Sequence, residues 1–273
     1  MLLDESFADK IHLPLKNMKY VAWSIVAVWF VLITSIIGVI VFPNQEMSGA
    51  PPYGEDLTEI PPFDPRVLGA QWERPNVPTR VGIQVGHWKN DEVPDELENL
   101  RGNTGAQGGG KSEWEVNYSI AVEMAAMLES QGVMVDILPA TVPPEYWADV
   151  FVAIHADGSL DQSVSGFKFA GPWRDVTGKS AKLVQLLEQE YLLQTQLPLD
   201  PNVTRNMRGY YAFSWWRFEH SIHPMTVAVI AETGFLTNPS DQRFLIDSPE
   251  ISARAMADGV LAFLEGEGLL ESG

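Results

Sequence analysis

The sequence contains no cysteine. Disulfide bridges, thiolate metal sites and cysteine nucleophiles are therefore excluded, and a zinc site would have to use histidine and carboxylate ligands. Positive charge is also scarce, because 18 Lys and Arg stand against 36 Asp and Glu and leave a formal net charge of −18. Nucleic-acid binding needs clustered Lys and Arg, so this balance argues against a nucleic acid as a partner.

Charged residues are missing altogether between Tyr20 and Phe42. At about 1.5 Å per residue, this apolar stretch is long enough to cross about 30 Å of hydrocarbon. A cleaved secretory signal has a shorter apolar core of about 7–15 residues. Residues 20–42 are therefore predicted to form an uncleaved transmembrane anchor.

The distribution of lysine around this stretch predicts its orientation. Lys10, Lys16 and Lys19 precede it, whereas no Lys or Arg occurs in residues 43–65. The positive-inside rule then predicts a cytoplasmic tail at residues 1–19 and a single-pass protein of the cell membrane whose remaining chain is extracytoplasmic.

Residues 43–79 are rich in proline and have little periodic hydrophobicity. Such a composition is typical of an extended, semi-rigid linker that holds a folded domain away from the membrane. An alternative remains open, in which part of the segment packs along the domain surface with Leu68 and Trp72 as anchors.

The folded domain is predicted to span residues 80–273, and its hydrophobic periodicity alternates between strands and helices. Strands are expected at 80–85, 133–138, 150–155, 166–170 and 226–231, and helices at 113–131, 178–193 and from Ser248-Pro249 onward. This alternation indicates an α/β fold with a mostly parallel twisted sheet flanked by helices, preceded by the single transmembrane helix.

Three of these strands end in polar groups that could meet at one edge of the sheet. His87 follows the first strand, His155 ends the apolar run from Val150, and Glu232 follows the strand at 226–231, while Glu113 opens a helix. Two neutral imidazoles and one carboxylate leave a fourth tetrahedral position open for water, which is the ligand count of a hydrolytic zinc site. A further carboxylate would supply a general base.

Four short motifs carry a family resemblance. They are G-H at residues 86–87, E-W-E-V-N at 113–117, A-I-H-A-D at 153–157 and E-T-G-F-L-T-N at 232–238. In this order, over about residues 80–265, they resemble the zinc-dependent N-acetylmuramoyl-L-alanine amidases that cut peptidoglycan.

The resemblance implies that His87, Glu113 and His155 bind Zn²⁺ and that Glu232 is the catalytic carboxylate. It also implies a peptidoglycan substrate, cut at the amide between the lactyl group of N-acetylmuramic acid and L-alanine. Glu113 is preferred to Glu115 as ligand because the family motif has an asparagine four residues after the ligand.

The chain departs from the family pattern at several positions, which bear on substrate contacts more than on metal binding. Trp88-Lys89 follow His87 where the family usually has two glycines, and Asp157 stands where it usually has asparagine. Asp157, His223 and Asn238 are the candidate substrate-binding residues. The long segment 88–112 could cover the site or recruit an activator protein.

Structural readings compete with these assignments. His87 could cap a loop, Glu113 could be an acid favoured by the helix dipole, and Glu232 could pair with a Lys or Arg. The aromatic residues of segment 210–218 are expected to cover the sheet rather than form a sugar platform.

Two other functions remain open. One is a zinc peptidase that cuts within the stem peptide of peptidoglycan. The other is an inactive metal-binding domain that holds the wall or a partner protein, which the presence of Glu232 disfavours.

Overall fold

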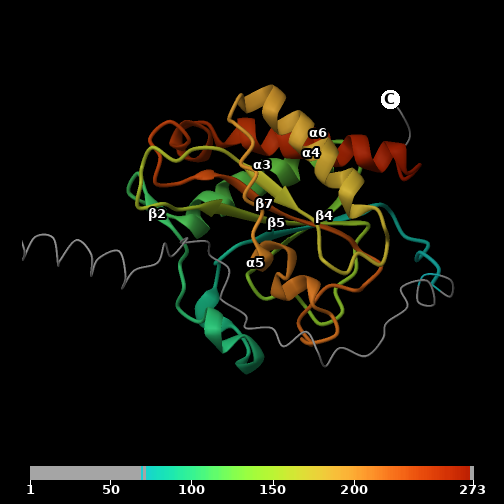
Figure 1. Cartoon of the computed structure of the whole chain (residues 1–273). Helices are drawn as coiled ribbons and strands as arrows, with labels where there is room; N and C mark the ends of the chain where they lie inside the picture. Colours follow the sequence, from blue (N-terminus) through green and yellow to red (C-terminus); the bar gives the residue numbers. More distant parts are fainter. Residues whose placement is uncertain (1–68, 70–71, 271–273) are drawn as a thin grey trace, which may run out of the picture. The chain divides into compact units, whose positions relative to one another are not determined.

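The computed structural model describes residue 69 and residues 72–270 (Figure 1). The predicted cytoplasmic tail (1–19), the predicted anchor (20–42) and most of the predicted linker (43–79) lie outside the described residues and stay predictions. Within the described part of the chain, no helix combines the length and the apolar character needed to cross a membrane.

A five-stranded sheet forms the centre of the domain. Its order is β4 (Met134–Leu138), β1 (Arg80–Val85), β5 (Val150–Asp157), β7 (Val227–Phe235) and β6 (Lys168–Ala170). The first four strands are parallel, and only the edge strand β6 runs antiparallel to its neighbour β7. The predicted mostly parallel α/β fold is confirmed.

The two central strands, β5 and β7, have the burial expected of strands in a parallel sheet. Every residue of β5 and of β7 is buried, as expected for apolar runs in a parallel sheet that is covered on both faces. The apolar run of β7 was expected to end at Ala231, but the strand continues to Phe235 because Phe235 pairs with Asp157 beyond an irregularity in β5.

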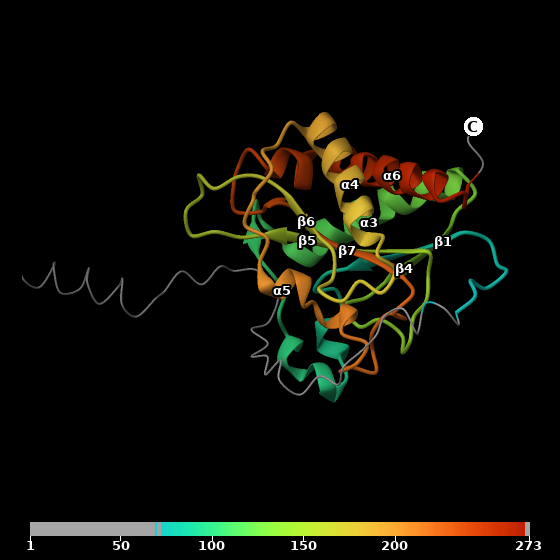
Figure 2. The same ribbon diagram turned by 45° about the vertical axis from the view of Figure 1, so that its right-hand side comes forward.

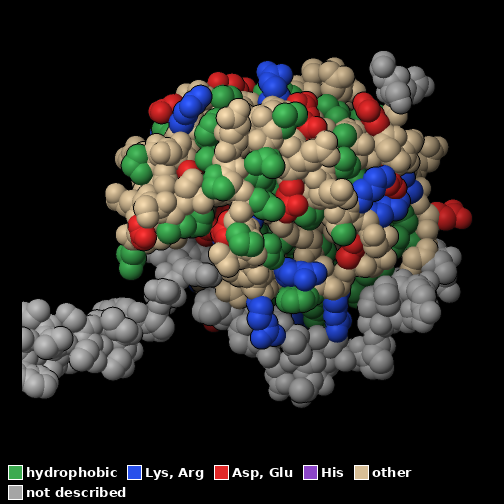
Figure 3. All heavy atoms as spheres, turned by 45° about the horizontal axis from the view of Figure 1, so that its top comes forward, with side chains coloured by type: hydrophobic (Ala, Val, Ile, Leu, Met, Phe, Trp, Pro, Cys, Tyr) green, Lys and Arg blue, Asp and Glu red, His purple; other side chains and the backbone are tan. Residues whose placement is uncertain are grey.

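Three long helices cover one face of the sheet, as Figures 1 and 2 both show. They are α3 (Glu113–Ser130), α4 (Ser180–Thr195) and α6 (Pro249–Gly266). Proline at the first turn of α6 fits the predicted start of that helix. The surface over α4 and α6 mixes acidic, basic and apolar side chains (Figure 3), as expected for helices whose other side is buried.

Short helical segments and loops cover the opposite face. These are η2 (Asn90–Glu92), η3 (Asp95–Leu100), α5 (Arg205–Arg208) and η4 (Tyr211–Phe213). Tyr210, Tyr211 and Phe213 are buried here in one cluster with Phe151 of β5. The expectation that this aromatic segment covers the sheet is confirmed for these three residues.

The remaining elements are short. The pair β2 (Gln107–Gly108) and β3 (Lys111–Ser112) forms a small hairpin directly before α3, and η5 (Arg243–Asp247) precedes α6. At the amino end of the domain, the Trp72 ring lies 5.9 Å from the Trp147 ring. The end of the predicted linker therefore packs on the domain through Trp72, whereas Leu68 lies outside the described residues.

Candidate metal centre

The strand register brings the predicted site residues to one edge of the sheet. Val85 of β1 pairs with Ile154 of β5, so that His87 and His155 follow neighbouring positions. His155 in turn pairs with Glu232 of β7. This is the carboxyl edge of the parallel strands, where open α/β sheets hold their ligands.

His87 is held so that one ring nitrogen faces inward. Its Nδ1 lies 3.1 Å from the carbonyl oxygen of Asn103, which can only accept a hydrogen bond, so Nδ1 carries the proton. Burial lowers the pKa of the His87 imidazole although Glu113 opposes this, so the ring is favoured in its neutral form. The buried Nε2 then has a free lone pair and no hydrogen-bond partner.

Glu113 is completely buried at the first turn of α3. Three groups orient its carboxylate: Ala106 N–H donates to Oε2 (2.8 Å), and Ala156 N–H (3.1 Å) and the Asn117 amide (3.3 Å) donate to Oε1. Gly105 leaves room for it, because a Cβ there would lie 2.1 Å from Glu113 Oε2.

Glu115 has a different role in the same turn. Its Oε2 accepts hydrogen bonds from the backbone N–H of Ser112 (2.9 Å) and from the Ser112 hydroxyl (2.7 Å), in a capping box at the start of α3. Of the two glutamates considered for metal binding, the geometry thus brings only Glu113 to the histidines.

The histidines and Glu113 meet at a single carboxylate oxygen. His155 Nδ1 lies 2.9 Å and His87 Nε2 lies 3.4 Å from Glu113 Oε1. The two imidazole rings are nearly perpendicular, with an interplanar angle of 82°. Gly86 permits this approach, because a Cβ at that position would lie 2.4 Å from the His155 ring.

The donor set suits a divalent cation. His87 Nε2 and Glu113 Oε1 are both acceptors, and two buried acceptors repel each other unless a cation lies between them. The ligand atoms of His87, Glu113 and His155 lie within 4.8 Å of one another. Two imidazoles and one carboxylate with room for a further ligand match the donors of a catalytic zinc site.

The charge of Glu113 is stabilised by its surroundings. Burial alone would raise the pKa of this carboxyl, but the electrostatic effect of His87 and His155 and the hydrogen bonds from His155 and from Ala106 N–H lower the pKa to about 2. Glu113 is therefore ionised at neutral pH, which is the state in which a carboxylate binds a metal.

Glu232 lies at the same edge but in a different environment. It is buried, and its Oε2 has no hydrogen-bond partner. Burial raises the pKa of the Glu232 carboxyl well above its usual range, the neighbouring carboxylates Asp157 and Glu113 add to this, and Lys168 opposes it. An unpaired acid with a raised pKa in a buried site is a candidate general base.

Lys168 of the edge strand β6 pairs in register with Glu232. Its ammonium group contacts the carboxylates of Asp157 (2.7 Å) and Asp200 (3.0 Å). Asp157 is therefore buried in an ion pair beside the catalytic candidate. Burial raises the pKa of Asp157 to about 6 although Lys168 opposes this.

The other two candidate substrate residues, Asn238 and His223, have contacts of their own. Asn238 is buried in the turn after β7, where its Oδ1 accepts from Ser240 N–H and its amide donates to Val164 O. His223 precedes β7, and its ring lies 5.9 Å from the Trp72 ring. β7 begins at Val227, shortly after His223, and reaches Glu232 at the carboxyl edge. His223 is therefore at the opposite edge of the sheet, separated from Glu232 by about 17 Å of strand.

Three residues near the site were missed from the sequence. Lys168 pairs with Asp157, the Tyr210 hydroxyl lies 3.3 Å from His155 Nε2, and Gln84 accepts a hydrogen bond from Tyr210. Gln84 is fully buried in β1 among apolar residues, and a lone amide in such a strand is the kind of signal that could have pointed to it. Lys168 and Tyr210 gave no such signal, because their positions depend on the antiparallel register of β6 and on the path of a loop.

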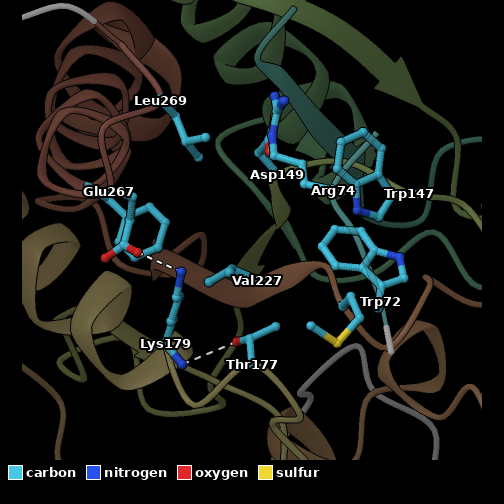
Figure 4. A pocket seen from close by; sticks show the side chains of 11 residues that line it. Trp72, Arg74, Trp147, Asp149, Thr177, Lys179, Val227, Glu267 and Leu269 are labelled. Carbon is cyan, nitrogen blue, oxygen red and sulfur yellow. Dashed lines mark hydrogen bonds and ion pairs between the residues drawn. The ribbon is translucent and has the colours of Figure 1, made fainter. Parts of the chain in front are cut away.

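The opposite, amino edge of the sheet carries a separate cavity of about 180 Å³ (Figure 4). Its charged side chains are paired with one another: Arg74 with Asp149, and Lys179 with Glu267. The indole rings of Trp72 and Trp147 form one of its walls. The pairing leaves no charged group of this cavity available for chemistry.

Comparison with known proteins adds independent findings. Residues 81–262 match the family model described as N-acetylmuramoyl-L-alanine amidase. Among curated protein sequences, none matches the chain.

Several solved structures are similar. The catalytic domain of CwlV, an N-acetylmuramoyl-L-alanine amidase from Bacillus (Paenibacillus) polymyxa var. colistinus, is 20% identical, with 68% of this chain and 98% of that chain covered and a TM-score of 0.47. The amidase AmiC2 of Nostoc punctiforme is 20% identical, with 68% and 97% covered and a TM-score of 0.49. For the amidase Ami1 from Mycobacterium smegmatis the identity is 17%, the coverage 69% and 97%, and the TM-score 0.48.

Proposed function

The chain belongs to the N-acetylmuramoyl-L-alanine amidase family, and from this premise we propose that it is a zinc-dependent, membrane-anchored amidase. The bond it hydrolyses is the amide between the lactyl group of N-acetylmuramic acid and L-alanine in peptidoglycan. The observation that carries the proposal is the convergence of His87 Nε2 and His155 Nδ1 on Glu113 Oε1, at 3.4 and 2.9 Å.

His87, Glu113 and His155 would hold the ion. Zinc bound there would supply a Lewis acid that polarises the scissile carbonyl and lowers the pKa of the attacking water. The contacts of Glu113 with Ala106, Ala156 and Asn117 keep its carboxylate oriented toward both rings, so the ligand set is organised before an ion arrives.

Glu232 performs the proton transfers in this proposal. Its unpaired oxygen takes a proton from the attacking water, and the acid formed returns that proton to the nitrogen of the leaving L-alanine. Burial favours a carboxyl group that can hold the proton between the two steps, because it disfavours the charged form.

The test is mass spectrometry of muropeptides digested by the zinc-loaded full chain. The proposal expects stem peptides with a free L-alanine amine and glycan strands with free lactyl carboxyl groups. Cleavage within the stem peptide would instead support a zinc peptidase. Absence of any cleavage would support the metal-binding domain without activity.

A substitution at Glu232 tests the assigned base. Glu232→Gln should keep the fold and the zinc content, because the side chain is not among the ligands, and should lower hydrolysis by about 10²–10⁴-fold. A variant with wild-type activity would contradict the role of Glu232.

The membrane anchor at residues 20–42 is part of the proposal and rests on the sequence alone. It would place the enzyme on the outer side of the cell membrane, tethered near the wall. Fractionation of cells that express the native chain tests this. Recovery in the membrane fraction is expected, and a soluble, released form would contradict the anchor.

Segment 88–112 is proposed to control access or to recruit an activator. Glu96 in this segment accepts hydrogen bonds from the backbone and the ring of His220 (2.8 and 2.7 Å), which connects it to the loop that precedes β7. Ala106, at its other end, contacts Glu113. Deletion of residues 91–98 should change activity, and an unchanged rate would remove this part of the proposal.

A further inference from the structure

A buried chain of hydrogen bonds that begins at Gln84 reaches the Nε2 side of the His155 ring. The Gln84 amide nitrogen donates to the carbonyl oxygen of Ala140 (2.7 Å) and to the hydroxyl of Tyr211 (2.5 Å). A backbone carbonyl can only accept a hydrogen bond, so the amide nitrogen must face Ala140. The side-chain oxygen of Gln84 therefore points the other way.

The side-chain oxygen of Gln84 determines where the Tyr210 hydroxyl directs its proton. The Tyr210 hydroxyl donates to Gln84 Oε1 at 2.8 Å. Because a phenol has a single proton, its oxygen is left as an acceptor toward its other neighbour. That neighbour is His155 Nε2, at 3.3 Å.

With an ion between His155 and Glu113, this chain favours one position for the His155 proton. Nε2 donates to Tyr210, and Nδ1, which lies 2.9 Å from Glu113 Oε1, is left to present its lone pair to the ion. His87 uses the opposite arrangement, with Nδ1 held by Asn103 and Nε2 facing inward. Each histidine thus has its own acceptor, which selects a different ring nitrogen for the metal.

We propose that Gln84 and Tyr210 are positioning residues that hold His155 with Nδ1 toward the metal and so set the zinc affinity of the site. This inference rests on the proposed zinc site. The acceptors behind metal-binding histidines fix the tautomer and the ring orientation, and their loss costs about 10–100-fold in metal affinity.

The chain provides a matched control in Tyr211. Tyr210 and Tyr211 are both buried, and both hydroxyls are hydrogen-bonded to Gln84. The Tyr210 hydroxyl also lies 3.3 Å from His155 Nε2. A general effect of losing a buried hydroxyl should therefore appear in both phenylalanine variants, and a positioning effect only in one.

The experiment is a zinc titration of the metal-free full chain against a chromophoric chelator. Tyr210→Phe should weaken zinc binding by about 10–100-fold, and Tyr211→Phe should leave it within about threefold of wild type. Melting temperatures of the metal-free variants control for folding. Equal affinity of the two variants would overturn the proposal, whereas a wild-type chain that binds no zinc would instead overturn the proposed function.

A second measurement needs no variant. Long-range ¹H–¹⁵N NMR spectra of the zinc-loaded chain, labelled at histidine, identify the protonated nitrogen of each ring. His155 should carry its proton on Nε2 and His87 on Nδ1. A proton on Nδ1 of His155 would contradict the proposal even if the variants failed to fold.

Discussion

The two ends of strand β5 place buried acids in opposite circumstances. Before its amino end, Asp149 accepts hydrogen bonds from Arg74 Nε (2.6 Å), Arg74 Nη2 (2.9 Å) and the backbone N–H of Arg80 (2.9 Å). Across from its carboxyl end, Glu232 has a buried oxygen without any hydrogen-bond partner, and His87 has a ring nitrogen in the same state.

The difference between the paired Asp149 and the unpaired Glu232 distinguishes an acid that stabilises the fold from a candidate functional acid. A buried acid with all its oxygens paired, such as Asp149, holds the fold together, here by joining Arg74 to the start of β1. Unpaired buried carboxylate and imidazole groups cost free energy, so their presence together at the carboxyl edge supports a ligand there. The proposed function therefore lies at the carboxyl edge, whereas the ion pairs around the amino-edge cavity hold the fold together.

Removal of the metal should give the largest contrast between the two edges. Chelation removes the ion that His87, Glu113 and His155 are proposed to bind. At zinc concentrations 1,000-fold above Kd, the stabilisation lost is about 4 kcal/mol, or about 10 °C in melting temperature for a domain of this size. Calorimetry with and without chelator measures this shift. A chelator effect that persists in Glu113→Gln would place the metal elsewhere.

The adjacent glutamates Glu113 and Glu115 test the assignment within a single helical turn. Glu113→Gln should weaken zinc binding by more than about 100-fold, because the loss of a ligand exceeds the loss of its hydrogen-bonded support. Glu115→Gln should leave zinc affinity unchanged and lower stability only slightly, because its contacts are those of a helix cap and glutamine can also make them. If Glu115→Gln weakened zinc binding and Glu113→Gln did not, the ligand would be Glu115 and not Glu113.

At the amino edge, Asp149→Ala should lower the free energy of unfolding by about 2–4 kcal/mol, because three hydrogen bonds to charged or backbone donors are lost. Denaturant unfolding measures the change. Arg74→Met is the partner variant, and the double variant should cost less than the sum of the two. Zinc affinity and kcat of the folded protein should not change, and their loss would show that the amino edge takes part in function.

Lys168→Met should give the smallest effect, a shift in the pH profile. Lys168 lowers the pKa of Glu232, so its loss raises that pKa further. A general base works only when deprotonated, and the acid limb of kcat/KM should therefore move to higher pH. Asp200 also contacts Lys168, so Asp200→Asn is the control, and it should shift the acid limb of kcat/KM less. A shift to lower pH in Lys168→Met would contradict the role of Lys168.

The sequence was sufficient for features that depend on strand ends. The apolar runs at 150–154 and 227–231 predicted two parallel strands, and the parallel arrangement alone brings His155 and Glu232 together. The same logic applies to His223: a residue before a parallel strand lies at the opposite edge from a residue after it. The chain order thus already separated His223 from the metal ligands.

Other parts of the site depend on contacts that periodicity does not encode. Tyr210 reaches Gln84 across 126 positions of sequence through the path of a loop. Lys168 meets Glu232 only because β6 turns back antiparallel to β7. The resemblance predicted Glu113 rather than Glu115 as the ligand, but the physical reason is visible only in the helix cap, since both glutamates lie in the first turn of α3.

Zinc bound by the unpaired groups at the carboxyl edge would be visible by anomalous diffraction at the zinc edge, from crystals of the zinc-loaded protein. We expect one zinc peak within about 2.0–2.2 Å of His87 Nε2, His155 Nδ1 and a Glu113 oxygen, with none in the cavity at the amino edge. A peak at the amino edge, or none among these three residues, would contradict the proposed zinc site.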